Sequence, residues 1–215
     1  MPTNSQDSRD VSILGCRLTL TCGRSIAAQI ASWAAAGHRG YVCVSNTHQV
    51  VLAQSNKDLH RAMDDALAVT TDSQVLAKAM SHLGNPYPEP ILYGPDLMAA
   101  VIEYAVRANL SLGLYGSNPS TCEAVRQRVL REHPSARLVH LQCPPMTSLA
   151  QLTSEPAIAE LRAAAPDILL VSLGCPKQEM WMHRVSDRLN GVCVGLGGAF
   201  EFYGGVRARS PAWVH

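Results

Sequence analysis

The sequence has almost no excess of charge. Its 18 Lys and Arg residues face 17 Asp and Glu residues, a net charge of +1 over 215 residues. Proteins that bind nucleic acid through its phosphates cluster many Lys and Arg residues, so nucleic acid is not an expected partner. Intrinsic disorder is excluded as well, because it requires low hydrophobicity and high net charge, whereas 47% of these residues are hydrophobic.

Long hydrophobic runs are also missing. The longest apolar stretches, at residues 167–174 and 192–200, are far shorter than the roughly 20 residues of a membrane-spanning helix. Residues 1–10 are polar, without the apolar centre of a secretory signal, and are expected to form a mobile tail. The sequence therefore predicts a cytoplasmic protein in which residues 11–215 form a single domain.

Several sequence patterns of metal and cofactor sites are absent. The seven cysteines are scattered, with no Cys-x-x-Cys pair, which favours free thiols in a reducing compartment. No Asp-x-Asp sequence occurs, so the usual carboxylate pair for a divalent cation is not indicated. The three spaced glycines of a dinucleotide fingerprint are missing too, which disfavours an NAD-dependent oxidoreductase. We expect neither a metal nor a cofactor.

What the sequence does contain is an alternation of two hydrophobic periods. Short runs typical of strands lie at residues 11–14, 17–19, 41–45, 67–71, 112–115, 137–142, 168–173 and 192–196. Helical patterns lie at residues 25–36, 57–66, 96–108, 121–132, 156–164 and 176–189. This order predicts a Rossmann-like α/β fold, an open and mostly parallel sheet with helices on both faces. The proline-rich residues 84–90 are expected to join two lobes.

In open α/β sheets, ligands bind beyond the carboxyl ends of the strands, and two such ends carry polar residues. Asn46 follows the strand at 41–45, where it is either a helix N-cap or a ligand of a sugar hydroxyl. Asp72 follows the strand at 67–71, where it is either an N-cap or a general base. The residues alone leave both pairs of alternatives open.

Two further strand ends suggest an anionic ligand. Gly116 and Ser117 begin a glycine turn before a helix, which fits either a plain turn or a phosphate site. Lys177 stands in the first turn of a helix, where its charge opposes the helix dipole. An anionic group beside Lys177, with hydroxyls near Gln178, would resolve that conflict. Arg209, in the glycine-rich last segment, either binds a diphosphate or is solvated.

Five segments, taken in order, resemble the WecG/TagA/CpsF family of bacterial glycosyltransferases. The strongest is Gly-Cys-Pro-Lys-Gln-Glu at 174–179, similar to the family's Gly-x-Pro-x-Gln-Glu. The others lie at residues 93–97, 114–116, 143–146 and 194–202 with 209–213. The similarity extends over nearly the whole chain, from residue 11 to residue 213.

The resemblance implies an inverting, metal-independent transfer of a sugar from a UDP donor to a polyprenyl-diphosphate-linked sugar, in cell-surface or exopolysaccharide synthesis. The sugar would be an N-acetylhexosamine, a hexose or a uronic acid. Asp72 falls on the family's catalytic Asp, the base that takes the proton of the acceptor hydroxyl. The substrate-binding residues expected from the motifs are Asn46, Gly94, Asp96, Gly116, Ser117, Lys177, Gln178, Glu179, Gly197, Glu201 and Arg209.

Departures from the family pattern leave a second hypothesis open. Ser73 stands where the family usually has Gly, and Val44 where Thr is frequent, so the chain is alternatively a nucleotide-sugar-binding paralogue without catalysis, acting as a partner or regulator. The family normally continues into a basic, apolar appendage that reaches the membrane, and this appendage is expected to be absent here. We therefore expect weak peripheral contact with the inner face of the membrane. The sequence leaves the oligomeric state open, with a homo-oligomer as one of the alternatives.

Overall fold

The computed structural model describes residues 9–21, 23–83 and 91–208. An antiparallel hairpin of β1 (Arg9–Ile13) and β2 (Cys16–Leu20) begins this part. It packs against β4 of the main sheet, where the backbone N–H of Val69 donates to Thr19 Oγ1 at 3.1 Å. Of the expected mobile tail at residues 1–10, Arg9 and Asp10 instead belong to β1, where they pair with β2, and residues 1–8 lie outside the described residues. The expected lobe junction at 84–90 lies wholly outside them, and the division into two lobes stays a prediction.

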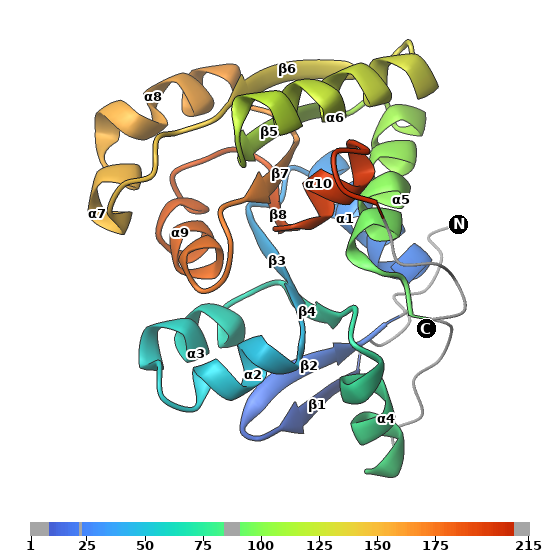
Figure 1. Cartoon of the computed structure of the whole chain (residues 1–215), viewed down its shortest axis with the longest axis vertical. Helices are drawn as coiled ribbons and strands as arrows, with labels where there is room; N and C mark the ends of the chain where they lie inside the picture. Colours follow the sequence, from blue (N-terminus) through green and yellow to red (C-terminus); the bar gives the residue numbers. More distant parts are fainter. Residues whose placement is uncertain (1–8, 22, 84–90, 209–215) are drawn as a thin grey trace.

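Six strands of the described residues form one parallel sheet (Figure 1). Its order is β4-β3-β8-β7-β5-β6, and every neighbouring pair is parallel. The strands are β3 (Gly40–Ser45), β4 (Ala68–Thr71), β5 (Ser111–Gly116), β6 (Arg137–Gln142), β7 (Ile168–Ser172) and β8 (Val192–Gly195). The central strands β8 and β7 are almost wholly buried because helices cover both of their faces.

Helices connect these strands. They are α1 (Gly23–Ala35), α2 (Thr47–Ala53), α3 (Lys57–Asp64), α4 (Gln74–His82), α5 (Gly94–Arg107), α6 (Pro119–Glu132), α7 (Leu149–Leu152), α8 (Glu155–Ala164), α9 (Lys177–Val185) and α10 (Ala199–Tyr203). Their starts follow helix-end chemistry. Proline occupies the first turn of α5, α6 and α8, and side chains of Asn56 and Asn118 cap α3 and α6.

Two apolar cores lie on opposite faces of the sheet. One is formed with α1, α5, α6 and α10, and includes Ile30, Val101 and Phe200. The other is formed with the hairpin, α3 and α9, and includes Leu59 and Trp181. The α/β fold with an open parallel sheet and helices on both faces is thereby confirmed. It brings the carboxyl ends of six strands, and the helix starts that follow them, to one edge of the molecule.

Candidate active site

Asp72 lies directly after β4, at the carboxyl edge of the sheet. Its backbone N–H donates to the carbonyl of Ser45 at the end of β3 (3.3 Å), and its carboxyl accepts a hydrogen bond from the backbone N–H of Gly94. Burial raises the pKa of the Asp72 carboxyl, and the hydrogen bond from Gly94 lowers it in part. A half-buried carboxyl at this edge has the environment that a general base needs.

The helix after Asp72 is capped by its neighbour. Ser73 Oγ accepts from the backbone N–H of Leu76 at 3.4 Å and is the N-cap of α4. The alternative that Asp72 is the cap is therefore wrong, because a serine in the next position takes that role. The departure of Ser73 from the family's glycine also gains a physical reason, since serine is a preferred cap.

Gly94 begins α5 beside Asp72. A Cβ atom at Gly94 would lie 3.5 Å from Asp72 Oδ2 and 3.2 Å from the Cβ of Ala199, the first residue of α10. The starts of α5 and α10 therefore meet at the Asp72 carboxyl. Asp96 stands in the same first turn of α5, where its backbone N–H donates to Tyr93 at 2.8 Å.

Asn46 caps α2. Its Oδ1 accepts from the backbone N–H of Gln49 at 3.1 Å, which confirms the N-cap interpretation. Thr47 Oγ1 lies 3.1 Å from Ser73 Oγ, so the starts of α2 and α4 adjoin at the ends of β3 and β4. The role of Asn46 toward a sugar hydroxyl stays a prediction, which its exposed position permits.

The glycine at the end of β5 is required by packing within the protein, whether or not a ligand binds there. Gly116 has φ +105°, and a Cβ there would lie 2.1 Å from the carbonyl oxygen of Ser172 in β7. The backbone N–H of Ser117 donates to that same oxygen at 2.6 Å. Only glycine fits so close to β7. Close packing of β5 and β7 therefore accounts for Gly116, and its predicted contact with phosphate stays a prediction.

The Gly-Cys-Pro-Lys-Gln-Glu segment places three polar side chains at the start of α9. Lys177 Nζ donates to the carbonyl of Thr147 at 3.1 Å, so its ammonium group is held against the loop between β6 and α7. Gln178 Oε1 accepts from the backbone N–H of Gly197 at 3.0 Å. Gln178 Nε2 donates to Glu179 Oε1, also at 3.0 Å. The predicted residues Gln178, Glu179 and Gly197 are thus brought into direct contact.

One loop connects this group to Asp72. In the β8–α10 loop, Gly197 binds Gln178, and two residues later Ala199 packs at Gly94 beside the Asp72 carboxyl. Glu201, within α10, is paired with Arg207 at 3.7 Å. The predicted Arg209 lies outside the described residues.

The family model described as the glycosyl transferase WecG/TagA/CpsF family matches residues 11–215. The chain belongs to this family. A Staphylococcus aureus (strain NCTC 8325 / PS 47) relative, named N-acetylglucosaminyldiphosphoundecaprenol N-acetyl-beta-D-mannosaminyltransferase, is 23% identical over 172 residues, covering 80% of this chain and 65% of the relative. A Bacillus subtilis (strain 168) relative of the same name is 26% identical over 137 residues, covering 63% and 51%. The chain thus spans less than two thirds of these relatives.

Sequence reasoning missed one residue of this family member's site. Ser172 ends β7. Its carbonyl oxygen lies against Gly116 and accepts a hydrogen bond from the backbone N–H of Ser117, and its Oγ donates to the carbonyl of Gly197 at 2.8 Å. It therefore links the strand ends of β5, β7 and β8. The sequence held one signal for it, because Ser172 is the polar residue that ends the otherwise apolar strand at Ile168–Ser172.

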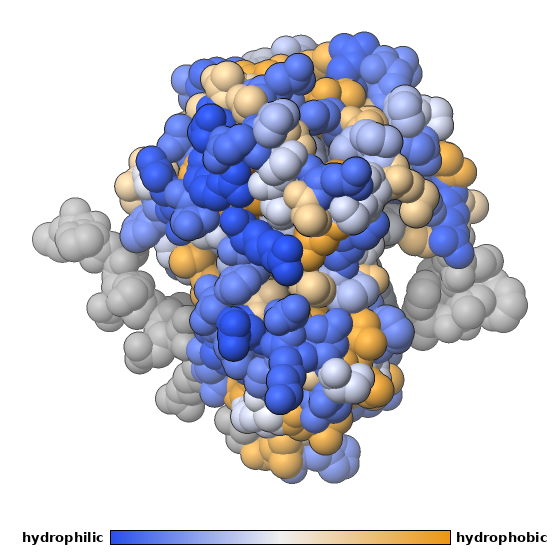
Figure 2. Space-filling view, turned by 90° about the vertical axis from the view of Figure 1, so that its left-hand side faces the viewer, coloured by the Kyte–Doolittle hydropathy of each residue, from blue (hydrophilic) through white to orange (hydrophobic). Residues whose placement is uncertain are grey.

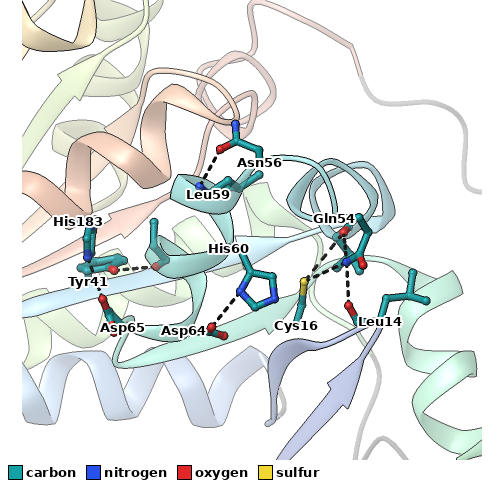
Figure 3. A network of polar contacts seen from close by, with 12 residues as sticks. Leu14, Cys16, Tyr41, Gln54, Asn56, Leu59, His60, Asp64, Asp65 and His183 are labelled. Atoms are coloured by element: carbon teal, nitrogen blue, oxygen red, sulfur yellow. Dashed lines mark hydrogen bonds and ion pairs between the residues drawn. The ribbon is translucent and has the colours of Figure 1, made fainter.

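A surface pocket of about 580 Å³ lies away from the predicted residues, between the hairpin turn and α3. Figure 3 shows its polar contacts. Gln54 Nε2 donates to the carbonyl of Leu14 at 2.8 Å, and His60 pairs with Asp64 at 2.9 Å. The first contact ties the end of α2 to the hairpin turn, and the second lies within α3. The pocket contains none of the residues predicted from the family motifs.

The described part of this glycosyltransferase-family chain offers neither a spanning helix nor a metal cluster. None of its helices combines the length and the apolarity that crossing a bilayer requires. Within the same residues, no group of three or more His, Cys, Asp or Glu side chains could hold a metal ion. The face with α7, α8, α9 and α3 is mostly hydrophilic, with apolar atoms in separate small areas (Figure 2). Metal-independent transfer stays a prediction.

Proposed function

We propose that the protein transfers a sugar from a UDP donor to a polyprenyl-diphosphate-linked sugar. Family membership supports a glycosyl transfer. The names of both relatives describe transfer of N-acetylmannosamine to N-acetylglucosaminyldiphosphoundecaprenol, so N-acetylmannosamine is the first donor sugar to test among the N-acetylhexosamines, hexoses and uronic acids. The acceptor lipid implies work at the inner face of the cell membrane.

The position of Asp72 carries this proposal. Its carboxyl is half-buried at the carboxyl edge of the sheet, is not used as a helix cap, and lies where α5 and α10 begin. As a base it takes the proton of the acceptor hydroxyl while that oxygen attacks the anomeric carbon of the donor. The bond from the anomeric carbon to the diphosphate breaks with its electron pair on the leaving UDP. Attack opposite the leaving group inverts the anomeric centre.

The diphosphate leaves from the face of the sugar opposite Asp72, and its negative charge needs positive charge on that face. Backbone N–H groups at helix starts and Lys177, the first residue of α9, supply it at the same edge of the sheet. Arg209 remains the second cation of the proposal. Because these groups are in place before charge develops on the leaving oxygen, the transfer is proposed to need no metal ion.

Titration with UDP, followed by a transfer assay, tests this function. We expect UDP to bind, and UDP to be released when UDP-N-acetylmannosamine and N-acetylglucosaminyldiphosphoundecaprenol in detergent are both present. Omitting the acceptor is the control for simple hydrolysis. Absence of UDP binding would overturn the proposal. Binding without transfer to any lipid-linked acceptor would support the non-catalytic paralogue instead.

A further inference from the structure

The side chain of Gln178 ties together two loops at the carboxyl edge of the sheet. Its Oε1 accepts from the backbone N–H of Leu173, in the β7–α9 loop, at 3.4 Å. The same oxygen accepts from Gly197, in the β8–α10 loop, at 3.0 Å. Gly197 N–H is shared with the carbonyl of Val171 at 3.2 Å. Gln178 is only 4% exposed, so its amide serves contacts inside the protein.

The other end of the Gln178 amide, Nε2, is hydrogen-bonded to Glu179. Gln178 Nε2 donates to Glu179 Oε1 at 3.0 Å, and Glu179 is 1% exposed. An amide has one accepting and one donating end, so an acceptor on the Nε2 side decides which end faces the loops. Burial raises the pKa of the Glu179 carboxyl, and the thiol of Cys175 and the amide of Gln49 lie beside it. Burial, and after it the charge of Glu179, raises the pKa of the Cys43 thiol in β3.

The space for the Gln178 amide is provided by a glycine. A Cβ at Gly195, the last residue of β8, would lie 2.6 Å from Gln178 Nε2 and 2.7 Å from Met182 Cε. Both atoms are ends of flexible side chains, so an alanine would displace the amide before it displaced the backbone. The strand end, the amide and the carboxyl therefore form one closely packed unit.

We propose that Glu179 is a positioning residue, which accepts a hydrogen bond from Gln178 and so fixes the β7–α9 and β8–α10 loops against each other. These loops lead to Lys177 on one side and to Ala199 beside Asp72 on the other. The expected direct contacts of Gln178 and Glu179 with substrate stay predictions beside this role. Its catalytic consequence rests on the proposed function, whereas its structural part does not.

Two pairs of variants separate the acceptor role from other effects. Glu179→Gln keeps an acceptor oxygen in a side chain of the same shape, whereas Glu179→Met removes the acceptor and keeps the approximate volume. Gly195→Ala displaces the Gln178 amide from the opposite side. Gly198→Ala is its matched control, because Gly198 has φ −61° and a Cβ there would meet nothing within 4 Å.

Amide hydrogen exchange measured by NMR tests the structural part in the whole chain. We expect the N–H of Leu173 to exchange about tenfold faster in Glu179→Met and Gly195→Ala, since it loses its Gln178 acceptor. Gly197 should change less, because it keeps Val171. Glu179→Gln and Gly198→Ala should match the parent. Equal exchange in the parent and Gly195→Ala, or equal acceleration in Glu179→Gln and Glu179→Met, would overturn the proposal.

Kinetics of the proposed transfer test the consequence. Glu179→Met and Gly195→Ala should lower kcat/KM for the UDP-sugar by about tenfold, while Glu179→Gln keeps both the rate and the pH profile of the parent. Loss of a titrating limb in Glu179→Gln would show that Glu179 ionises during the reaction and would contradict the positioning role. If the parent itself transfers no sugar, the proposed function fails, and hydrogen exchange alone decides the positioning role.

Discussion

The carboxyl of Asp72 accepts a hydrogen bond from the backbone N–H of Gly94, the residue that begins α5. The contact joins the end of β4 to the start of α5, a helix within the connection from β4 to β5. It leaves the carboxyl half-buried, near the positive end of α5, without using it as the cap of α4. A base in this position is pre-oriented by the backbone.

The Asp72 carboxyl should make the stability of the protein depend on pH, and the direction of that dependence follows from its raised pKa. Because burial raises its folded-state pKa above the ordinary 3.8, the folded state binds the proton more tightly than the unfolded state. The group's contribution to stability therefore falls as the pH rises through the window between 3.8 and the raised pKa. Asp72→Asn should raise Tm at neutral pH, since it removes a buried charge.

Thermal unfolding of both proteins across this pH range is the measurement. The Tm difference should be largest at neutral pH and should shrink as acid protonates the parent carboxyl. A lower Tm for Asp72→Asn at neutral pH would contradict the desolvation of Asp72.

Ser73 should be a structural residue. Ser73→Ala removes the cap of α4 and should lower the free energy of unfolding by about 1 kcal/mol, while Ser73→Gly costs only a few tenths. Denaturant unfolding measures both. Sugar transfer should continue at about the parent rate in each. A variant that keeps its stability and loses transfer would instead give Ser73 a part in the reaction.

Gly116 should tolerate no side chain. Gly116→Ala places a Cβ 2.1 Å from the Ser172 carbonyl at φ +105°, and we expect a loss of about 3 kcal/mol or more from strain and overpacking. Urea titration of the variant beside Gly198→Ala, whose new Cβ has open space, checks this. A Gly116→Ala protein as stable as that control would show that β5 and β7 do not approach so closely.

These residues show what the sequence could and could not predict. The sheet was predictable because its central strands are short apolar runs, as at Ile168–Ser172. The helix starts after β3 and β4 were predicted at Asn46 and Asp72, but that Ser73 caps α4 in place of Asp72 depends on where a carboxyl points in space. The short helices α7 and α10 were missed because four or five residues carry too little periodicity.

The links within the site were harder to predict. Gln178 contacts Gly197, 19 residues away, and Gly116 at the end of β5 contacts Ser172 in the adjacent strand β7. Such contacts arise from the strand order, which places β5, β7 and β8 side by side although they are distant in the chain. The motifs therefore named the right region, while the partner of each residue required the fold.

Removal of divalent cations should leave transfer unchanged. The proposal assigns the diphosphate charge to helix starts and cationic side chains, so dialysis against a chelator should alter the UDP-release rate by less than about twofold. A loss of activity that added Mg²⁺ or Mn²⁺ restores would contradict metal independence.

The acid limb of the pH–rate profile should belong to Asp72. Only the carboxylate accepts the proton of the acceptor hydroxyl, so the rate should fall as the pH decreases through the raised pKa of Asp72. The profile of kcat/KM for the lipid-linked acceptor measures this limb. A limb at the ordinary pKa of an exposed aspartate would argue against Asp72 as the base.

The most direct test compares Asp72→Asn with the parent in two assays, UDP binding by calorimetry and sugar transfer to N-acetylglucosaminyldiphosphoundecaprenol. The asparagine keeps an acceptor for the Gly94 N–H but cannot take the hydroxyl proton. We predict UDP affinity within about twofold of the parent and a kcat lowered by about 10² to 10⁴. Transfer at the parent rate by Asp72→Asn would contradict the central claim that Asp72 is the catalytic base.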